Sequence, residues 1–567
     1  MIRHVIILLS LSAVFSGSVH SQNLGDDDRL RLIVKQYGQA EVTLSYISFR
    51  QLDHLSRNVS ILDVRDKVIE ISLSSLSVEW FISQKFSYKI KEKIAPKGLV
   101  SASSVSKAFQ WDTYPTYLQY DSIMQSFAGD YPSLCRLDTI GTSINGRMVL
   151  ALKISDNPGT DETEPEVFYS STMHGDETGG FILMLRLADY LLKNYNDNDR
   201  VKELVDNLEI WINPNANPDG TYTSGNSIDS PIRYNAHGVD LNRNFPDPFL
   251  PGMVNEKETL DMMKFMRNHR FVISANFHAG AELVNYPWDR WLDKFHADND
   301  WFDQISRAYA DTVHIYADPG YMYDLDNGVT RGAVWYVVYG GRQDFMTQEL
   351  HGREVTIELD YQHITPVYQL QALWDGNWHS LIGYLENALY GIHGSVLDSE
   401  SSRPVAAEIF IKGHDIDSSQ VYADTLTGTF VRLLEPGMWP LTLTAEGYRD
   451  TIVNVPVNAF QRSDITVYMV KKTTPPDDTS HLPEPPALYP NPASSVIYAL
   501  LPEEVTGSVN VSIFNQAGET MIYYDTEIYK DIPAQIDISR LSAGTYVAVF
   551  FNGKKNKSCM GRFIVIK

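Results

Sequence analysis

The 567-residue sequence contains only two cysteines, Cys135 and Cys559, and the expected domain boundaries place them in different domains. Disulfide bonds therefore cannot be the main crosslinks of the fold, and two lone thiols cannot build a structural zinc site. Any metal ion must be bound by histidine and carboxylate side chains.

Positive charge is also scarce, because 47 Lys and Arg residues stand against 71 Asp and Glu residues, a net charge of −24. Such a surface repels nucleic acids and anionic membranes and favours cationic ligands. We therefore expect no nucleic-acid partner. The same acidity can serve solubility alone, so it does not by itself indicate a basic substrate.

An apolar run at 5–15 follows the basic residue Arg3 and is too short to span a bilayer comfortably. Small residues precede Gln22, as they do at signal-peptidase sites. Residues 1–21 are therefore predicted to be a signal peptide, with an N-terminal anchor as the alternative.

The chain is predicted to fold into several domains. Residues 23–105 mix alternating apolar stretches with charge, which indicates a small α/β segment, either a removable pro-segment or a permanent N-terminal domain. Between 110 and 390, strand-like runs such as 166–170 alternate with helical stretches such as 180–194. This alternation predicts an α/β domain with a mostly parallel mixed sheet flanked by helices, whose ligands bind at the carboxyl ends of the strands.

Short alternating strands with turn signals follow at 391–470 and predict a β-sandwich. Residues 471–486 form a Pro-rich linker, which is expected to be extended. A second small β unit is expected at 487–567.

A candidate metal site begins with the segment His174-Gly-Asp-Glu177. A His and a Glu three residues apart can bind one cation from a strand-to-helix loop. Two His, one Glu and an open fourth position form an established catalytic zinc set. His278, which ends an apolar run, is the candidate third ligand. Alone, this spacing is common by chance, and most histidines are structural or lie on the surface.

Several further motifs occur in order. They are Asn-Pro-Asn-Ala-Asn-Pro-Asp-Gly at 213–220, Tyr-Asn-Ala-His-Gly-Val-Asp-Leu-Asn-Arg-Asn-Phe-Pro-Asp at 234–247, Leu-Val-Asn-Tyr-Pro-Trp-Asp at 283–289, Gly-Ala-Val-Trp-Tyr at 332–336, Gly-Gly-Arg-Gln-Asp at 340–344 and Thr-Ile-Glu-Leu at 356–359. On these motifs, residues 110–390 closely resemble the funnelin family of metallocarboxypeptidases. The closer match is the subfamily of carboxypeptidases N, E, D and M, which act on basic C-termini.

The resemblance implies a role for each matching residue. His174, Glu177 and His278 are expected to bind one Zn²⁺ in the catalytic domain. Asp240 is expected to orient a zinc-binding histidine, and Glu358 to act as the general base that takes a proton from water and delivers it to the leaving amine.

The resemblance also implies a set of substrate-binding residues. Arg233 is expected to polarise the scissile carbonyl, and Asn242 with Arg243 to bind the C-terminal carboxylate of the substrate. Tyr336 resembles the tyrosine that closes over the terminal residue. Arg147 resembles an outer substrate-binding arginine, although a surface role fits it equally.

Specificity depends on the pocket beyond the scissile bond. Asp289 stands where the subfamily carries an acidic pocket residue, and Gln343 matches the accompanying glutamine. A buried carboxylate pairs with Lys or Arg and stays uncompensated beside an apolar side chain. Glu282, in a stretch that departs from the family pattern, could add to this acidic role or compete for it.

The two β units also resemble known domains. Residues 391–470 resemble a transthyretin-like domain, on Gly-Ile-His-Gly-Ser-Val at 391–396 and Glu-Gly-Tyr at 446–448, and this implies a role in packing and stability. Residues 487–567 resemble a type IX secretion sorting domain, on Leu-Tyr-Pro-Asn-Pro-Ala at 488–493 and Leu-Ser-Ala-Gly-Thr-Tyr at 541–546. This implies contact with the secretion machinery and export across an outer membrane. A carbohydrate-binding sandwich is the alternative for this unit.

The expected function is that of a secreted, monomeric zinc carboxypeptidase that removes C-terminal Lys or Arg from peptides. The same mechanism on neutral or cell-wall peptides is one alternative. A catalytically inactive, surface-displayed binding protein is another, and the joint presence of the three metal ligands and Glu358 argues against it.

Overall fold

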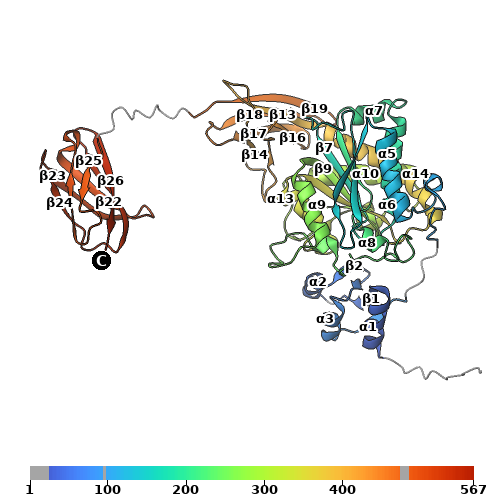
Figure 1. Ribbon diagram of the computed structural model, residues 1–567. Helices are drawn as coiled ribbons and strands as arrows, with labels where there is room; N and C mark the ends of the chain where they lie inside the picture. Colours follow the sequence, from blue (N-terminus) through green and yellow to red (C-terminus); the bar gives the residue numbers. More distant parts are fainter. Residues whose placement is uncertain (1–24, 47, 93–97, 473–483) are drawn as a thin grey trace, which may run out of the picture. The chain divides into compact units, whose positions relative to one another are not determined.

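A computed structural model describes residues 25–46, 48–92, 98–472 and 484–567 (Figure 1). The predicted signal peptide lies outside these residues, as does most of the predicted linker. The chain forms two compact units, of which the first ends at Lys471 and the second begins at Lys472. Within the described residues, no helix has both the length and the apolar character that crossing a membrane requires.

The first unit opens with a four-stranded antiparallel sheet in the order β2-β3-β1-β4, accompanied by three helices. Its elements are α1 (Asp26–Tyr37), β1 (Ala40–Ser45), α2 (Phe49–Ser56), β2 (Ser60–Arg65), β3 (Val68–Leu73), α3 (Val78–Ser83) and β4 (Tyr88–Ile90). Strand β1 alternates buried Ala40, Val42 and Leu44 with less buried residues, so one face of the sheet packs on a core of its own.

An eight-stranded mixed sheet forms the centre of the first unit, in the order β11-β10-β12-β9-β7-β8-β6-β5. The strands are β5 (Cys135–Thr142), β6 (Met148–Ile154), β7 (Glu166–Ser171), β8 (Glu209–Asn213), β9 (Phe271–His278), β10 (Ala281–Tyr286), β11 (Val329–Arg331) and β12 (Arg353–Asp360). Four of the seven pairings are parallel. The predicted α/β fold with a mixed sheet is confirmed.

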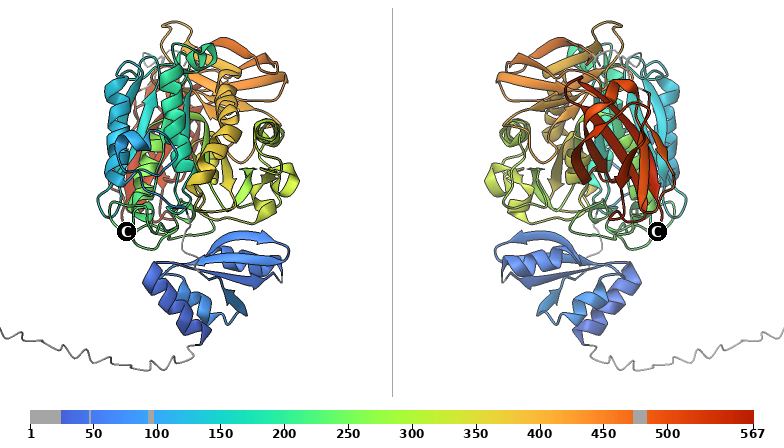
Figure 2. Two further views of the ribbon diagram at one scale, coloured as in Figure 1. Left: turned by 90° about the vertical axis from the view of Figure 1, so that its right-hand side faces the viewer. Right: turned by 90° about the vertical axis from the view of Figure 1, so that its left-hand side faces the viewer.

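Helices cover both faces of this sheet (Figures 1 and 2). One face packs on α5 (Tyr117–Asp130), α6 (Gly179–Asn194), α10 (Asn299–Tyr316) and α14 (Leu370–Glu386). The other face packs on α9 (Lys257–Arg267) and α13 (Arg342–Glu349). Strands β7, β8 and β12 are therefore buried at every residue, including the polar residues at their ends. Because β7, β9 and β12 are parallel, their carboxyl ends meet at one edge of the sheet.

A β-rich region completes the first unit, with sheets β16-β13-β19 and β15-β14-β17-β18. Its strands are β13 (Gly391–Asp398), β14 (Glu408–Ile411), β15 (Val421–Tyr422), β16 (Thr429–Arg432), β17 (Gly437–Thr444), β18 (Thr451–Val457) and β19 (Arg462–Met469). The second unit, red in Figure 2, contains sheets β20-β21-β24 and β23-β22-β25-β26 around a separate core. Its strands are β20 (Ala487–Tyr489), β21 (Val496–Leu500), β22 (Gly507–Phe514), β23 (Thr520–Ile528), β24 (Ala534–Asp537), β25 (Gly544–Asn552) and β26 (Lys557–Val565).

A buried ion network connects the large sheet to the β-rich region. Asp298, which precedes α10, accepts from Arg353 of β12 at 2.9 Å and from Arg432 of β16 at 2.6 Å and 2.9 Å. His414 lies 2.7 Å from the same carboxylate. Although burial opposes ionisation of Asp298, Arg432 and Arg353 hold its pKa well below the usual range. One carboxylate therefore stabilises two buried guanidinium groups from different layers.

We predict that Asp298→Ala lowers the free energy of unfolding of the first unit by about 3 kcal/mol, because buried Arg353 loses its anion and buried Arg432 keeps only Asp415. Denaturant unfolding measures this, and Asp300→Ala at the exposed start of α10 is the matched control. A midpoint equal to that of the control would contradict the prediction.

Candidate active site

The two strand ends at the centre of the large sheet bring three predicted metal ligands together. His174 and Glu177 lie in the loop between β7 and α6, and His278 is the last residue of β9. Strands β7 and β9 are parallel neighbours, so both carry these residues to the same edge. This is the edge at which open α/β sheets bind ligands.

The three side chains converge tightly and are 2–3% exposed. Glu177 lies 2.7 Å from His174 Nδ1 through Oε1 and 2.8 Å from His278 Nδ1 through Oε2, and the two Nδ1 atoms are 3.0 Å apart. Two imidazole nitrogens and a carboxylate within this space suit one small divalent cation. The donors present therefore fit zinc.

Asp240 contacts His174 at the ring nitrogen that does not face Glu177. Its Oδ1 lies 2.9 Å from His174 Nε2, and its Oδ2 accepts from Arg233 Nε at 2.9 Å. Although burial opposes ionisation, Arg233 and His174 hold the pKa of Asp240 well below its usual range. The contact to Nε2 leaves Nδ1 of His174 facing Glu177, which is the orientation that a metal ligand needs.

Glu358 lies beside the metal centre. Strand β12 pairs in parallel with β9 and places Glu358 opposite His278. The side chain is 8% exposed, and its Oε2 has no hydrogen-bond partner among the described residues. Burial and the nearby Glu177 raise the pKa of Glu358 well above that of a free glutamate. A carboxyl group with an unpaired oxygen at this position can exchange a proton with a ligand in the pocket.

Most of the predicted site residues line one pocket. They are His174, Glu177, Arg233, Asn242, Arg243, His278, Asp289, Tyr336 and Glu358. Gln343 does not line the pocket itself, but its side-chain amide donates a hydrogen bond to Asp289, which does. Arg147 is held elsewhere, because its guanidinium contacts Asp219 and the carbonyl oxygens of Tyr222 and Gly225.

Asp289 also lines this pocket, and it is 4% exposed. Its Oδ1 accepts from Gln343 Nε2 at 2.9 Å, and it forms no salt bridge within the described part of the chain. Burial and the neighbouring Asp344 raise its pKa well above the usual range. A methyl group on Gly332 would lie only 1.8 Å from Oδ1, so the glycine allows the carboxylate to pack against the backbone there.

Glu282 does not share this acidic role. It lies outside the pocket lining, and its carboxylate accepts from the backbone N–H of Met322 at 3.3 Å. Neighbouring Leu283 of β10 pairs with Glu358, so the alternation of the strand directs Glu282 to the opposite face. The possibility that Glu282 contributes to the pocket is therefore wrong.

Strand β2 of the N-terminal segment covers the pocket. Its Ile61 carbonyl accepts from Arg243 Nη2 at 3.3 Å, Leu62 lines the pocket, and Asp63 accepts from Trp335 Nε1 at 3.0 Å. Ser60 also donates to Asp240 Oδ2 at 2.6 Å. The space left is about 30 Å³, which is about one water molecule. No sequence motif indicates these contacts, because β2 has the pattern of an ordinary strand.

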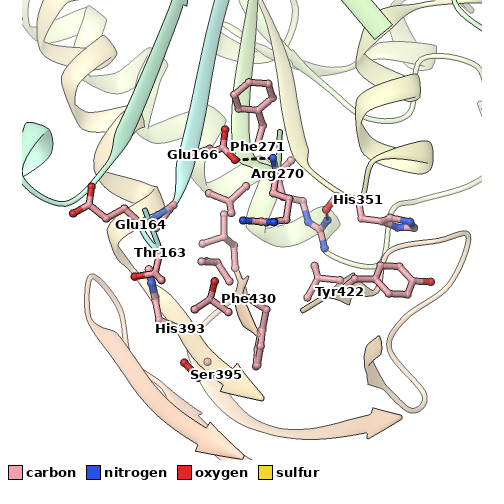
Figure 3. Close-up of a pocket in the computed structure, with 18 of the residues that line it drawn as sticks. Thr163, Glu164, Glu166, Arg270, Phe271, His351, His393, Ser395, Tyr422 and Phe430 are labelled. Atoms are coloured by element: carbon pink, nitrogen blue, oxygen red, sulfur yellow. Dashed lines mark hydrogen bonds between the residues drawn. The ribbon is translucent and has the colours of Figure 1, made fainter. Parts of the chain in front are cut away.

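A larger cavity of about 520 Å³ lies between the opposite end of the sheet and the β-rich region (Figure 3). Its charged groups are largely paired: Glu166 accepts from the backbone of Arg270 at 2.9 Å, and Arg462 contacts Asp464 at 2.8 Å. None of the predicted site residues lines this cavity. The chemistry therefore lies at the smaller pocket.

Comparison with known proteins agrees with this geometry. Residues 120–380 match the zinc carboxypeptidase family, and residues 487–567 match the secretion system C-terminal sorting domain, which indicates type IX secretion rather than carbohydrate binding. The chain is 35% identical over 378 residues to human carboxypeptidase D, covering 63% of this chain and 27% of that protein. It is 33% identical over 404 residues to the catalytic chain of carboxypeptidase N from Rattus norvegicus, covering 63% of this chain and 86% of that one.

The chain thus spans about a quarter of the length of carboxypeptidase D but most of the carboxypeptidase N catalytic chain. Zinc is the metal indicated by the family match, and the clustered side chains of His174, Glu177 and His278 fit it. On this agreement, the chain belongs to the zinc carboxypeptidase family and carries a type IX secretion sorting domain.

Proposed function

We propose that this protein is a secreted zinc carboxypeptidase that removes C-terminal Lys or Arg residues from peptides. The observation that carries the proposal is the buried, unpaired Asp289 in the same pocket as the metal centre and Arg243. Arg243 and Asn242 suit the free carboxylate of a chain end, and Asp289 suits a cationic side chain. A substrate with both groups is a peptide that ends in Lys or Arg.

The catalytic roles follow from the positions of the side chains. His174, Glu177 and His278 would hold the zinc ion, which when bound lowers the pKa of water and polarises carbonyl groups. Glu358 accepts the proton of the attacking water and passes it to the leaving amine. Arg233, fixed by Asp240, donates hydrogen bonds to the oxygen on which negative charge develops.

Tyr336 covers the terminal residue of the substrate in this proposal. Arg147 takes no part in it, because Asp219 already pairs with its guanidinium. No observation favours neutral substrates, cell-wall peptides or a non-catalytic binding role over this function.

For residues 23–105, the contacts favour a removable cover over a permanent domain. Besides β2, Gln39 donates to Asp176 at 2.9 Å and accepts from the backbone N–H of Arg233 at 2.8 Å. Tyr336 packs against the core of the segment. A pocket of about 30 Å³ cannot admit a lysine side chain, so we infer that the segment must leave before substrate binds.

For residues 391–470, we propose a transthyretin-like domain that stabilises the catalytic domain. Its support is the two-sheet arrangement and the buried pairing of Arg432 with Asp298.

We predict that Glu358→Gln lowers kcat by about 10²- to 10⁴-fold, because the amide cannot take up the proton. Hydrolysis of a Lys-terminated peptide measures this, with zinc content determined in parallel. A metal chelator should abolish activity, and added zinc should restore it. Full activity in the variant or with the chelator would contradict the proposed mechanism.

We predict that Asp289→Asn lowers kcat/KM for Lys- and Arg-terminated peptides by about 100-fold, because it removes the charge that pairs with the substrate. Peptides that differ only in their last residue, Lys against Leu, measure the preference. Asp293→Asn, an exposed acid four residues away, is the matched control. A wild-type protein that cleaves Leu and Lys peptides equally would refute the pocket assignment.

We predict that the double variant Arg57→Ala, Arg65→Ala raises the activity of the full chain about 30-fold, because each of the two lost contacts contributes about 1 kcal/mol to closure and about 1.4 kcal/mol is a factor of ten. Arg57 donates to Tyr339 at 2.8 Å, and Arg65 pairs with Asp324 at 3.0 Å. Arg31→Ala is the control, because its pairing with Glu79 stays within the segment. Equal activity in the double variant and the control would argue for a cover that does not limit access.

A further inference from the structure

The first turn of α13 contacts Asp289 at both its side chain and its backbone. Gln343 donates to Asp289 Oδ1 at 2.9 Å. The next residue, Asp344, accepts from the backbone N–H of Asp289 through Oδ1 and from that of Arg290 through Oδ2, both at 3.0 Å. Asp344 is 3% exposed. Two consecutive residues therefore determine where the pocket carboxylate stands.

Glycines border the Asp289 carboxylate. A methyl group on Gly332 would lie 1.8 Å from Oδ1, and one on Gly341 would lie 3.6 Å from Oδ2. On these two sides the carboxylate meets backbone and not side chains, so its hydrogen bonds contribute directly to its position. A carboxylate that must meet a cation at hydrogen-bond distance needs neighbouring groups that hold it in position.

The two neighbouring carboxylates differ in how their charge is balanced. Arg290 is buried, and its Nε lies 3.4 Å from Asp344 Oδ2, with Nη1 3.5 Å from Asp247. Asp344 therefore has a cation within the protein. Asp289 has none among the described residues, although it is one residue from Arg290 in the chain. Arg290 is shared between Asp344 and Asp247, and it makes no salt bridge to Asp289 in the described structure.

We propose that Asp344 is a positioning residue for substrate specificity, which holds the backbone of Asp289 so that its carboxylate stands where it meets the side chain of the substrate. This inference rests on the proposed function, because it assumes that Asp289 binds a cationic side chain. Asp344 does not touch the substrate and acts only through Asp289.

The substitution Asp344→Asn tests this directly. Asparagine has a single acceptor oxygen, so one of the two backbone N–H groups loses its partner and Asp289 shifts. We expect kcat/KM for Lys-terminated peptides to fall about 10- to 100-fold, mainly through KM, with Leu-terminated peptides unchanged or cleaved slightly faster.

Glu349→Gln is the matched control, because it makes the same acid-to-amide change at an exposed position of the same helix. Zinc content and the unfolding midpoint are measured for each variant. If Asp344→Asn does not fold, Asp344→Ser, which also accepts only through one oxygen but is smaller, replaces it. The same loss of Lys preference is expected.

The outcomes separate the inference from the function on which it rests. A variant that keeps the wild-type Lys preference, or that loses activity equally on Lys and Leu peptides, overturns the role of Asp344. In both of these cases the wild-type protein still prefers Lys-terminated peptides, so the proposed function is not contradicted. A wild-type protein without any Lys preference would contradict the proposed function itself.

Discussion

The convergence of two imidazoles and one carboxylate at the ends of two parallel strands is the constraint on which the rest of the site depends. Bringing His174, Glu177 and His278 within about 3 Å of one another in a dry interior is unfavourable unless their lone pairs share a cation. Asp240 and Arg233 then balance the remaining charge, and β12 supplies Glu358 alongside. Parallel pairing of β7, β9 and β12 makes this geometry possible.

Charge balance differs between the groups of this one pocket. Asp240 has a buried partner in Arg233, whereas Glu358 has no partner for its Oε2 among the described residues. Asp289 accepts from the amide of Gln343 and forms no salt bridge within the described part of the chain. A buried carboxylate without a cation costs stability, and this cost is the physical basis of the preference proposed above for a cationic side chain.

The N-terminal segment contacts residues of the same pocket. The Ile61 carbonyl oxygen contacts Arg243, the arginine proposed to bind the carboxylate of a substrate. Leu62 lines the pocket, and Ser60 adds a hydrogen bond to Asp240. None of the contacts described for this segment reaches the Asp289 carboxylate. Under the proposed function, a cationic substrate makes a contact there that the segment does not make.

The amino-acid sequence by itself predicted the α/β fold and the three metal ligands, because strand periodicity and short ordered motifs are local properties of the chain. The roles of Glu358 and Asp289 came from the resemblance of those motifs to a family, and they stay predictions. The tertiary structure alone decided which neighbours these residues meet. Glu282 and Leu283 are adjacent, yet strand alternation sends them to opposite faces. Arg147 pairs with Asp219, and β2 closes the pocket, through contacts 72 and more than 100 residues apart. Such long-range pairings depend on packing, and no local pattern encodes them.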